Sequence, residues 1–467
     1  MKDKIIERDE QKYNFVTPQK YEFVTEKGLS KKVVEEISEV KKEPDWMRRL
    51  RLKSLEIFLE APMPNWGPDL RELNFDDITY YLRPESIKTR SWNDVPKDIK
   101  DTFEALGVPE MERKYLAGSV AQFESEGVYA NIKKELDAKG VIFSDLDTAL
   151  KEHPDIVKEY FMKAVPMRDN KFSALHGAVW SGGSFVYVPA GVKLDLPLMT
   201  YFRMNSAQEG QFEHTLIIAE KDSAVSYIEG CTAPVYNLSS LHSAVVEIYV
   251  KEKAKVRYTT VQNWSKDIYN LNTKRAWVDR DGKMEWVGGS LGSKVTMLYP
   301  SSYLRGERAT ASHLNIVLSS GNTWKDGGAK VLHLAPNTSS KVISKSISMD
   351  GGVSVYRGLL RISKGAYNSK SHVQCDALIL DDRSKSITYP HNEVYEDSAT
   401  VAHEASVGKI GEEELFYMQT RGLKEDEARS MIVLGFLDDV MKEIPLEFSL
   451  ELNRLIKLEM SKLGAVG

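Results

Sequence analysis

The sequence predicts a mainly β fold: a parallel β-helix core with helical regions at both ends. Two features of the middle part of the chain support this prediction. The first is a series of short alternating runs rich in Val, Ile, Tyr and Thr, separated by Gly, Asn, Asp and Ser, as strands are. The second is an irregular internal repeat of about 30 residues, a length typical of solenoids and propellers. The variable period and the lack of a Trp-Asp signature favour a β-helix. An antiparallel sandwich with chance similarity between its strands is the alternative.

Residues 1–162 are expected to form an N-terminal, mainly helical region. A charged helical pattern runs from about Ser30 to Pro62, and Pro44 splits it into two helices because proline lacks the N–H that a helix interior needs. A stretch rich in Pro, Asn and Asp follows and is typical of loops. Helical periodicity then returns from Asp98 to about Met162.

Residues 163–407 are expected to form the β-helix core. Thr215–Gly230 and Val246–Val261 align 31 residues apart, and each has an apolar run, a charged turn and then alternation. The strings VLHLAPNTSSKVISKS and LLRISKGAYNSKSHVQ repeat the pattern 28 to 29 residues apart. In a parallel coil, residues one repeat apart stack on adjacent turns, roughly 4.8 Å from each other.

Residues 408–467 are expected to form a C-terminal helical domain, because a solenoid needs a cap over its exposed end. Helices are predicted over Glu412–Arg421, Lys424–Glu443 and Leu446–Leu463. Two explanations stay open for the apolar stripes of the last two helices: packing against the solenoid, or a groove that a partner fills. The stripes consist of Met431, Ile432, Leu434, Leu437, Leu450, Leu455, Leu458 and Met460.

Composition narrows the function classes. The 467 residues permit two or three domains, and 63 basic and 68 acidic residues are well mixed, so no basic block predicts binding to nucleic acid or to an anionic membrane. No apolar run is long enough to span a membrane, and the N-terminus lacks a secretory signal, so a cytoplasmic protein with reduced thiols is expected. Secreted β-helix carbohydrate enzymes also need clustered carboxylates, and the sequence does not show that pattern.

The two cysteines are the residues most indicative of function. Cys231 lies 28 residues after Arg203 and 31 before Gln262, and Cys375 lies 28 before His403 and 29 before Glu404. Each thiol is therefore expected to stack between polar partners, with Arg203 stabilising a thiolate at Cys231. The alternative is a pair of buried, inert cysteines. The thiols are 144 residues apart, about five turns or roughly 24 Å, which is too far for a disulfide or a shared cluster.

Several long strings resemble the SufB/SufD family of the SUF system for iron–sulfur cluster assembly. They are SYIEGCTAP (226–234), VQNW (261–264), TKRA (273–276), QCD (374–376), HEAS (403–406) and KIGEEELFYMQTRGL (409–423). The similarity covers nearly the whole chain, and the N-terminal string YNFVTPQKYEFVTEKGLS is closer to the SufB branch than to the SufD branch. The resemblance implies a right-handed β-helix and a non-enzymatic scaffold.

The resemblance also implies roles for individual residues. Cys231 matches the sulfur acceptor, and Cys375 matches the cluster-site cysteine, with His403 and Glu404 as further ligands. The internal path for sulfur is matched by Arg203, Asn205, Gln262, Trp264 and Lys274. Without the resemblance, Trp264 would be interpreted as a side chain that fills the core, and Lys274 as a solvated surface residue. On a regular strand His403 and Glu404 face opposite sides, so both bind metal only if the strand bends. Ala402 replaces an acidic residue of the family, which removes one potential ligand.

Partners and cofactors are implied in the same way. The C-terminal helices are expected to bind a SufC-like ABC ATPase, which supplies ATP hydrolysis because this sequence has no P-loop. The β-helix is expected to pair with a SufD-like paralogue or with a second copy. Sulfur would arrive as persulfide from a cysteine desulfurase or a sulfur-transfer protein, and the cluster, expected to be [4Fe–4S], would be held transiently. Reduced FAD is a further expectation for the complex, although the sequence has no flavin motif. A structural solenoid subunit without a cluster is the alternative function.

Overall fold

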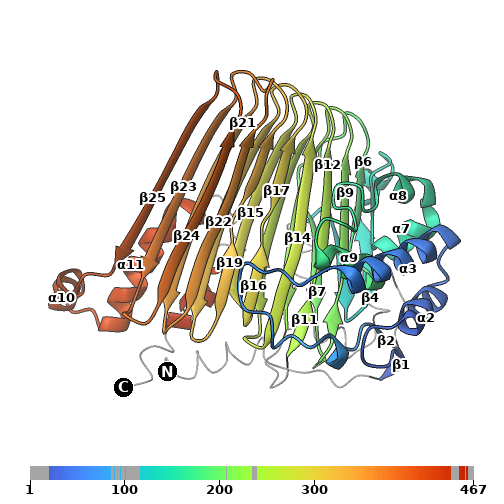
Figure 1. Ribbon diagram of the computed structural model, residues 1–467, viewed down its shortest axis with the longest axis horizontal. Helices are drawn as coiled ribbons and strands as arrows, with labels where there is room; N and C mark the ends of the chain where they lie inside the picture. The colour runs from blue at the N-terminus through green and yellow to red at the C-terminus, as the bar shows by residue number, and fades with distance from the viewer. Residues whose placement is uncertain are drawn as a thin grey trace.

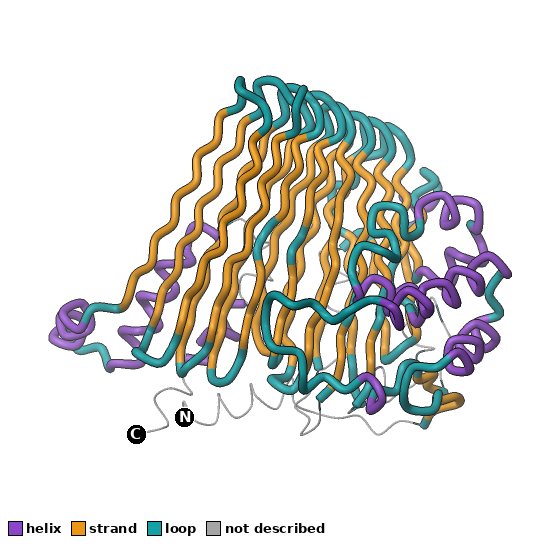
Figure 2. The backbone as a smooth tube through the Cα atoms, in the orientation of Figure 1, coloured by secondary structure: helices purple, strands orange, loops and turns teal. Residues whose placement is uncertain are grey.

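The computed structural model describes residues 20–85, 89, 95, 100, 116–206, 208–233, 239–442, 452–457 and 459–460. Its centre is a parallel β-solenoid of about eight turns, with helices at both ends (Figure 1). Strands make up 44% of the described residues and helices 23%, so the predicted fold class is confirmed. Figure 2 shows the strands as one continuous block between the two helical regions.

Two large sheets form the walls of the solenoid. The first sheet has ten strands, in the order β25 (Thr400–Lys409), β23 (Lys370–Ile379), β21 (Ser339–Met349), β18 (Thr310–Ser320), β15 (Lys283–Gly292), β13 (Lys255–Trp264), β10 (Ala224–Thr232), β7 (Leu198–Arg203), β3 (Gly118–Phe123) and β4 (Glu126–Ile132). The second sheet has thirteen strands: β5 (Ile142–Ser144), β6 (Phe185–Val188), β8 (Gly210–Gln211), β9 (His214–Ala219), β11 (Ser240–His242), β12 (Val245–Val250), β14 (Ile268–Val278), β16 (Val295–Leu298), β17 (Ser301–Leu304), β19 (Trp324–Gly327), β20 (Lys330–His333), β22 (Val353–Ile362) and β24 (Lys385–Val394). All pairings from β6 and β7 onward are parallel.

A left-handed residue recurs once per turn, just before each strand of the first sheet from β10 to β23. These residues have φ between 56° and 59°, and they are Asp222, Lys253, Asp281, Arg308, Asn337 and Asn368. Asn and Asp tolerate this conformation better than other residues with a side chain, which explains their abundance in the turns. The step between paired strands is not constant, because Lys283 pairs with Thr310 while Ala224 pairs with the more distant Lys255. The turns therefore differ in length while the strands stay in register.

Alternation along the strands builds a core between the two sheets. In β13, Val256 and Tyr258 point inward and stack on Val225 and Tyr227 of β10. Burying each such apolar side chain stabilises the fold by about 1.5–3 kcal/mol. Inward apolar residues continue along the whole solenoid to Val373 of β23.

Helices of the N-terminal region cover the outer face of the second sheet. They are α2 (Lys31–Lys41), α3 (Asp45–Glu60), α6 (Lys134–Asp137), α7 (Leu146–Glu152), α8 (Pro154–Tyr160) and α9 (Lys171–Val179), with the short 3-10 helix η1 (Phe75–Asp77). Side chains of α2, α3 and α9 form one apolar cluster with Tyr269, Leu271 and Met297 of the sheet. The predicted break at Pro44 is confirmed, because α2 ends at Lys41 and α3 starts at Asp45. The two-stranded sheet β1 (Tyr21–Val24) with β2 (Leu82–Pro84) lies beside them.

The predicted helical pattern from Asp98 to Met162 is wrong in its central part. Residues 118–132 form the antiparallel hairpin of β3 and β4, which extends the first sheet beyond β7. Every residue of β3 is buried, so both faces of that strand are covered and the alternation typical of a half-exposed strand is missing from the sequence. Helices α6, α7 and α8 do lie in the rest of the segment to Met162, but the strand β5 interrupts them. Apart from residue 100, residues 98–115 lie outside the described residues.

The C-terminal helices lie on the outer face of the first sheet. They are α10 (Glu412–Thr420) and α11 (Glu425–Met441), with further helical residues at 452–457 and 459–460. Leu437, Leu455 and Met460 are buried in one cluster with outward apolar residues of the sheet, whereas Met431 is 54% exposed. Packing on the solenoid therefore explains most of the predicted stripe. Leu450 and Leu458 lie outside the described residues.

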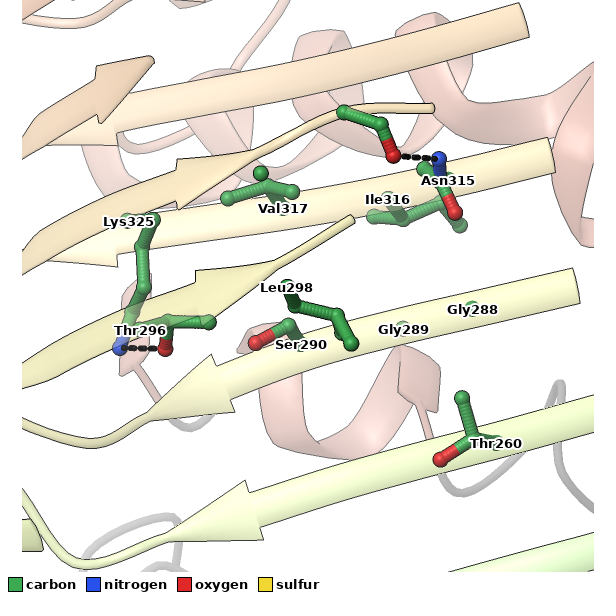
Figure 3. A pocket seen from close by; sticks show the side chains of 12 residues that line it. Thr260, Gly288, Gly289, Ser290, Thr296, Leu298, Asn315, Ile316, Val317 and Lys325 are labelled. Carbon is green, nitrogen blue, oxygen red and sulfur yellow. Dashed lines mark hydrogen bonds between the residues drawn. The ribbon is translucent and has the colours of Figure 1, made fainter. Parts of the chain in front are cut away.

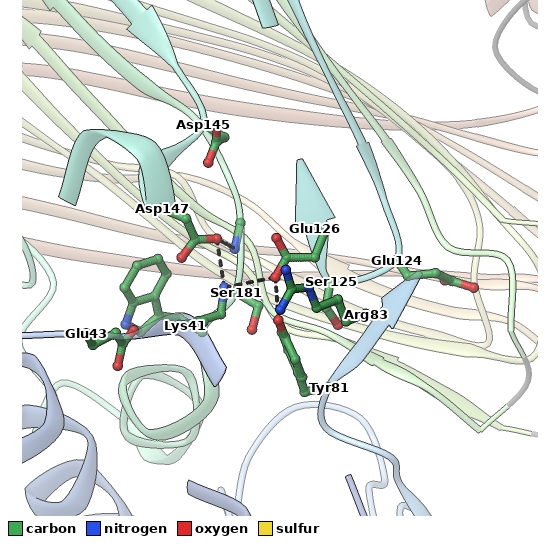
Figure 4. A network of polar contacts seen from close by, with 12 residues as sticks. Lys41, Glu43, Tyr81, Arg83, Glu124, Ser125, Glu126, Asp145, Asp147 and Ser181 are labelled. Carbon is green, nitrogen blue, oxygen red and sulfur yellow. Dashed lines mark hydrogen bonds and ion pairs between the residues drawn. The ribbon is translucent and has the colours of Figure 1, made fainter. Parts of the chain in front are cut away.

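A buried ion network joins the N-terminal helices to the solenoid (Figure 4). Lys41 at the end of α2 reaches Asp147 of α7 at 2.7 Å and Glu126 of β4 at 3.6 Å, and Tyr81 donates a hydrogen bond to Glu126. Asp147 also accepts the backbone N–H of Gly182 at 3.0 Å. Within the described residues, no helix combines the length and apolar character needed to cross a membrane.

We predict that Arg51→Ala strongly destabilises the N-terminal region. The Arg51 guanidinium is fully buried on α3, binds Glu43 through Nε at 2.7 Å and Nη2 at 2.6 Å, and donates to the carbonyl oxygens of Ala178 and Trp180. Its loss would leave the Glu43 carboxylate buried and unpaired, at a cost of about 3–5 kcal/mol.

The matched control is Arg48→Ala on the same helix, because Arg48 pairs with Glu35 at the surface. Exposed pairs contribute about 0–1 kcal/mol, so the control should change stability little. Urea unfolding followed by circular dichroism measures both variants. Equal losses for the two variants would contradict the assigned role of Arg51.

Candidate functional site

Cys231 lies near the end of β10, inside the solenoid and 1% exposed. In the sheet register it stands next to Gln262 of β13 on one side and Phe202 of β7 on the other. The predicted stacking of Cys231 on Gln262 is confirmed. Trp264, two residues further along β13, belongs to the same buried cluster as the thiol.

Arg203 does not stack on Cys231. The step from β7 to β10 is one residue longer than predicted, so Arg203 stands opposite Thr232 and its Nη1 donates to Thr232 Oγ1 at 3.1 Å. Adjacent residues of a strand point to opposite faces, which places Arg203 and the thiol on different sides of the sheet. Asn205 lies beyond the end of β7, where its backbone N–H donates to Glu124 Oε2 at 2.9 Å. Arg203 is thus not brought into the thiol's stack.

A buried ion pair lies on the same face as Cys231. Lys274 of β14 is 1% exposed, and its Nζ donates to Glu229 Oε1 at 2.9 Å and to the Tyr258 hydroxyl oxygen at 3.0 Å. Glu229 also accepts hydrogen bonds from Tyr258 and, at 3.0 Å, from Thr260. Burial by itself would raise the pKa of Glu229, but Lys274 and Tyr258 outweigh burial and lower it. Glu229 is therefore a carboxylate at neutral pH. The alternative explanation of Lys274 as a solvated surface residue is wrong, because its side chain is buried.

This environment keeps the Cys231 thiol protonated. Burial raises the pKa of Cys231 well above its ordinary value, and the Glu229 and Glu213 carboxylates raise it further, against the opposing effect of Lys274. Arg203 was expected to stabilise a thiolate, but it is not among these groups that shift the pKa of Cys231. Glu229, two residues before the cysteine on the same face, is the carboxylate closest in position to receive the thiol proton.

A second polar chain connects the partners of Cys231 to the second sheet. Asn270 Nδ2 donates to Gln262 Oε1 at 2.8 Å, and Asn270 Oδ1 lies 2.7 Å from Nδ1 of His242. The His242 ring is 4.4 Å from the Trp264 ring, and its Nε2 bonds to Glu213. Glu229, Glu213 and His242 were not among the residues predicted from the sequence. The position of Glu229 two residues before Cys231 was the one signal that could have identified it.

Cys375 lies on β23, five strand steps away from Cys231 along the first sheet, through β13, β15, β18 and β21. Both cysteines are free, as the predicted separation requires. Cys375 points into the solenoid and is 5% exposed. Burial raises its pKa to about 12, although a hydrogen bond with Tyr356 of β22 acts in the opposite direction.

Glu404 does not face Cys375. The step from β23 to β25 is one residue longer than predicted, so Ala405 stands beside Cys375 and Glu404 stands beside Gln374. The Glu404 side chain points outward, where it is 64% exposed and lies 3.4 Å from His372. The predicted stacking of Cys375 on Glu404 is therefore wrong, and Ala402, which stands beside His372, also lies on the outer face.

His403 is the ligand candidate that shares the interior with Cys375. It stands beside Val373, two residues from Cys375 on the same face, and lines a small cavity together with Tyr356 and His391. Burial lowers the pKa of His403, and its Nε2 has no hydrogen-bond partner within the described part of the chain. The expectation that His403 and Glu404 face opposite sides of a regular strand is confirmed.

The residues near Cys375 do not form a complete metal site. In the parts of the chain that the structure describes, no three His, Cys, Asp or Glu side chains gather closely enough to hold a metal ion. Cys375 and His403 supply a thiolate and an imidazole, which are suitable but too few for an iron–sulfur cluster. A cluster bound here would need further ligands from a second chain.

One row of side chains connects the two cysteine regions through the interior. Glu229 lies on the same face of β10 as Cys231. Each residue of the row pairs with the next one on the neighbouring strand, from Glu229 across four intermediate strands to Cys375. The row consists of Glu229, Thr260, Gly288, Asn315, Ser344 and Cys375. All members except Gly288 carry a polar group or a thiol, which is unusual for the centre of a β-structure.

The chain is similar to known families and proteins over nearly its full length. Residues 202–436 match the family described as SUF system FeS cluster assembly, SufBD core domain, and residues 33–199 match the SufBD protein N-terminal region. An iron–sulfur cluster assembly SufBD family protein of Staphylococcus haemolyticus is 55% identical over 456 residues, 98% of each chain. Another, from Staphylococcus saprophyticus, is 56% identical over 445 residues, 95% of each chain.

We predict that both thiols react slowly in the folded chain. At pH 8 iodoacetamide should alkylate each cysteine more than about 100-fold more slowly than in urea, where the thiol pKa returns to about 8.5. The rate at Cys375 should keep rising toward pH of about 12. The single-cysteine variants Cys231→Ser and Cys375→Ser assign the rates, and a folded-state rate that levels off near pH 8.5 would contradict the burial argument.

The raised pKa of Cys375 also makes the free energy of unfolding depend on pH. The folded chain keeps the Cys375 proton up to about pH 12, whereas the unfolded chain loses it near its ordinary value, so the folded state binds more protons in between. The Cys375 contribution to the free energy of unfolding should therefore fall as the pH rises through that window. Cys375→Ser should remove this part of the pH dependence.

Proposed function

The chain belongs to the SufBD family of iron–sulfur cluster assembly proteins, and on that basis we propose that it is a scaffold that accepts sulfur at Cys231 and holds a nascent cluster at Cys375. One observation carries the proposal: its only two thiols lie inside the same solenoid, five turns apart, in two different polar environments. A purely structural solenoid would have no need to bury Glu229 and Lys274 as an ion pair next to one of these thiols, because apolar side chains of similar volume do as well.

Retention of both cysteines supports a SufB-like role over a SufD-like one. The alternative, a structural partner subunit without its own cluster, is favoured by the lack of a third ligand near Cys375 within the described residues. After anaerobic reconstitution with iron and sulfide, a scaffold should show the visible absorption of a cluster, and a structural subunit should not.

Sulfur uptake at Cys231 would proceed by thiol–persulfide exchange. The Cys231 sulfur attacks the outer sulfur of a persulfide on the donor and gives up its thiol proton as it does so. A new S–S bond forms at Cys231, the S–S bond of the donor breaks, and the donor leaves as a thiolate that takes up a proton. Lys274 lies close enough to favour negative charge on the new persulfide. A cysteine desulfurase or a sulfur-transfer protein is the proposed donor.

Uptake requires movement, because the thiol is 1% exposed. A SufC-like ATPase bound to the C-terminal helices is the proposed source of that movement. Those helices pack on the outer face of the strands that carry the site: buried residues of α11 share a cluster with Ile228 of β10 and Val261 of β13. Phe416 and Tyr417 of α10 are 67% and 60% exposed and form an apolar surface suited to such a partner.

The last turn of the solenoid is the proposed site of pairing with a SufD-like paralogue or a second copy. Within the described chain, β24 and β25 each pair with one strand only, so one edge of each sheet is open. Tyr389 and Val394 of β24 and Val407 of β25 are each at least 46% exposed. A partner edge docked here would lie one turn from Cys375 and could supply the missing cluster ligands. A flavin exceeds the space inside the cavity beside His403, so reduced FAD would bind elsewhere in such a complex.

We predict separate phenotypes for the two cysteines. Cys231→Ser should lose persulfide labelling by a desulfurase. Cys375→Ser should keep that labelling but lose the visible absorption of a cluster after anaerobic reconstitution. Equal labelling of wild type and Cys231→Ser would refute the acceptor role, and an undiminished spectrum of Cys375→Ser would refute the anchor role.

The neighbouring pair His403 and Glu404 provides a matched comparison at the cluster site. The imidazole faces the interior with Cys375, while the carboxylate faces outward. His403→Ala should therefore lower the yield of cluster several-fold more than Glu404→Ala. The reverse order would show that the cluster lies on the outer face of the strand.

We also predict that the double variant Phe416→Ala, Tyr417→Ala weakens ATPase binding by at least about 10-fold, because exposed aromatic residues are common binding hot spots. Tyr367→Ala is the control, since Tyr367 is 57% exposed in a turn of the solenoid, far from α10 in the chain. Isothermal titration calorimetry measures the three affinities. Unchanged affinity in the double variant would place the contact elsewhere.

A further inference from the structure

A small cavity lies between the two sheets, in the stretch of the interior that separates the two cysteines (Figure 3). The cavity has a volume of about 30 Å³ that the centres of water molecules can reach. It therefore has room for about two water molecules or one slightly larger ion. Its polar lining comes from both sheets and consists of Thr260, Ser290, Thr296, Asn315 and Lys325.

Lys325 is a buried lysine that has no carboxylate partner within the described residues. Its side chain is 1% exposed, and Nζ donates to the carbonyl oxygen of Ser293 at 2.7 Å, to Ser293 Oγ at 2.5 Å and more weakly to Thr296 Oγ1 at 3.5 Å. Across the described residues, no carboxylate lies within ion-pairing distance of it. Burial accordingly holds the pKa of Lys325 well below its ordinary value. Lys274, which is equally buried, instead has Glu229 at 2.9 Å.

Ser290 supplies a second group without a partner. It is 5% exposed, and within the described chain its hydroxyl has no hydrogen-bond partner. In Figure 3 this hydroxyl points toward the end of the cavity where Lys325 and Thr296 lie. A buried hydroxyl normally finds a partner, so one that lines a cavity indicates a missing polar occupant.

Gly288 lines the end of the cavity away from Lys325, with Ser290 between them (Figure 3). A Cβ at this position would lie 3.2 Å from Asn315 Oδ1 and 3.7 Å from Thr260 Cγ2, which are its neighbours in the interior row. The backbone of Gly288 is not in the left-handed region, so the conformation alone does not demand glycine. The missing side chain thus leaves a gap in the row of polar residues between Glu229 and Cys375.

We propose that this cavity is a binding site for a small monovalent anion of the size of hydrosulfide, held by the Lys325 ammonium group and the Ser290 hydroxyl. An anion would give the lysine the partner that it lacks and would give Ser290 an acceptor. Neutral hydrogen sulfide could also enter and pass its proton to the uncharged amine, which leaves hydrosulfide beside ammonium.

The inference rests on the proposed function, because the cavity lies two strand steps from β10 and three from β23. The chain has no third thiol between the two sites, so sulfur cannot pass from cysteine to cysteine. Release of the outer sulfur of a Cys231 persulfide as hydrogen sulfide needs two electrons and two protons. An external dithiol supplies both as it becomes a disulfide: the persulfide S–S bond breaks and Cys231 regains its thiol.

Bromide is a suitable probe because it is a monovalent anion close to hydrosulfide in size, and its anomalous scattering locates it. Crystals of the full chain soaked in sodium bromide should show a bromide peak in the cavity within hydrogen-bond distance of Lys325 Nζ. The peak should be lost in Lys325→Met, which removes the charge. If Lys325→Met fails to fold, Ser290→Ala serves in its place and should lower the bromide occupancy at least twofold.

Gly289→Ala is the matched control. Its Cβ would project from the opposite face of β15, at an ordinary 3.4 Å from Leu452, so the bromide peak should persist. Absence of bromide in wild type, or its persistence in Lys325→Met, would overturn the anion site. Persulfide labelling of Cys231 is measured separately: sulfur uptake without bromide would overturn the anion site alone, and bromide without sulfur uptake would support the anion site and overturn the proposed function.

Discussion

Strand register in the first sheet is the constraint on which the rest of the structure depends. Side chains alternate between the interior and the outer face, so a shift of one residue in any turn exchanges the two sets. The register of β7 with β10 puts Phe202, not Arg203, beside Cys231. The register of β23 with β25 likewise puts Ala405 beside Cys375. The composition of both cysteine environments is therefore set by the lengths of the turns.

This dependence explains which features could be predicted from the sequence. Strands, their alternation and the approximate repeat are local properties, and so is the division of the first helices by Pro44, so these predictions agree with the structure. The length of the repeat varies from turn to turn, however, and periodicity alone cannot fix a step to a single position. Gln262 was assigned to the correct face, while Arg203 and Glu404 were each assigned to the wrong one.

Burial was the second property that the sequence could not supply. A lysine is most often solvated, so nothing local indicated that Lys274 would pair with Glu229 across the interior. The hairpin of β3 and β4 was missed for a related reason, since residues covered on both faces show no alternation. Both errors come from long-range packing, in which a segment's surroundings are set by chain far away in the sequence.

The two buried lysines show how one interior can treat charge in two ways. Removing an ammonium group from water costs several kcal/mol unless an anion or a set of hydrogen bonds replaces the water. At Lys274 a carboxylate fills this role permanently, and the same carboxylate lies beside the Cys231 thiol. At Lys325 only neutral oxygens of Ser293 and Thr296 do so, and a cavity adjoins the side chain. A fixed partner suits the covalent binding of sulfur proposed at Cys231, while an absent partner suits the exchangeable anion proposed beside Lys325.

The arrangement of layers connects this interior to the C-terminal helices. On β10 the row residue Glu229 points inward, and its neighbour Ile228 points outward into the apolar cluster that contains α11. Helix α11 is also tied to the sheet by polar contacts: Lys345 Nζ donates to the Phe436 carbonyl oxygen at 2.8 Å, and Arg429 donates to that of Leu380 at 3.1 Å. One layer of strands thus separates the helices from the row. A force applied to α11 by a bound partner would act on the strands whose inner faces hold both cysteines, without any contact between that partner and the interior.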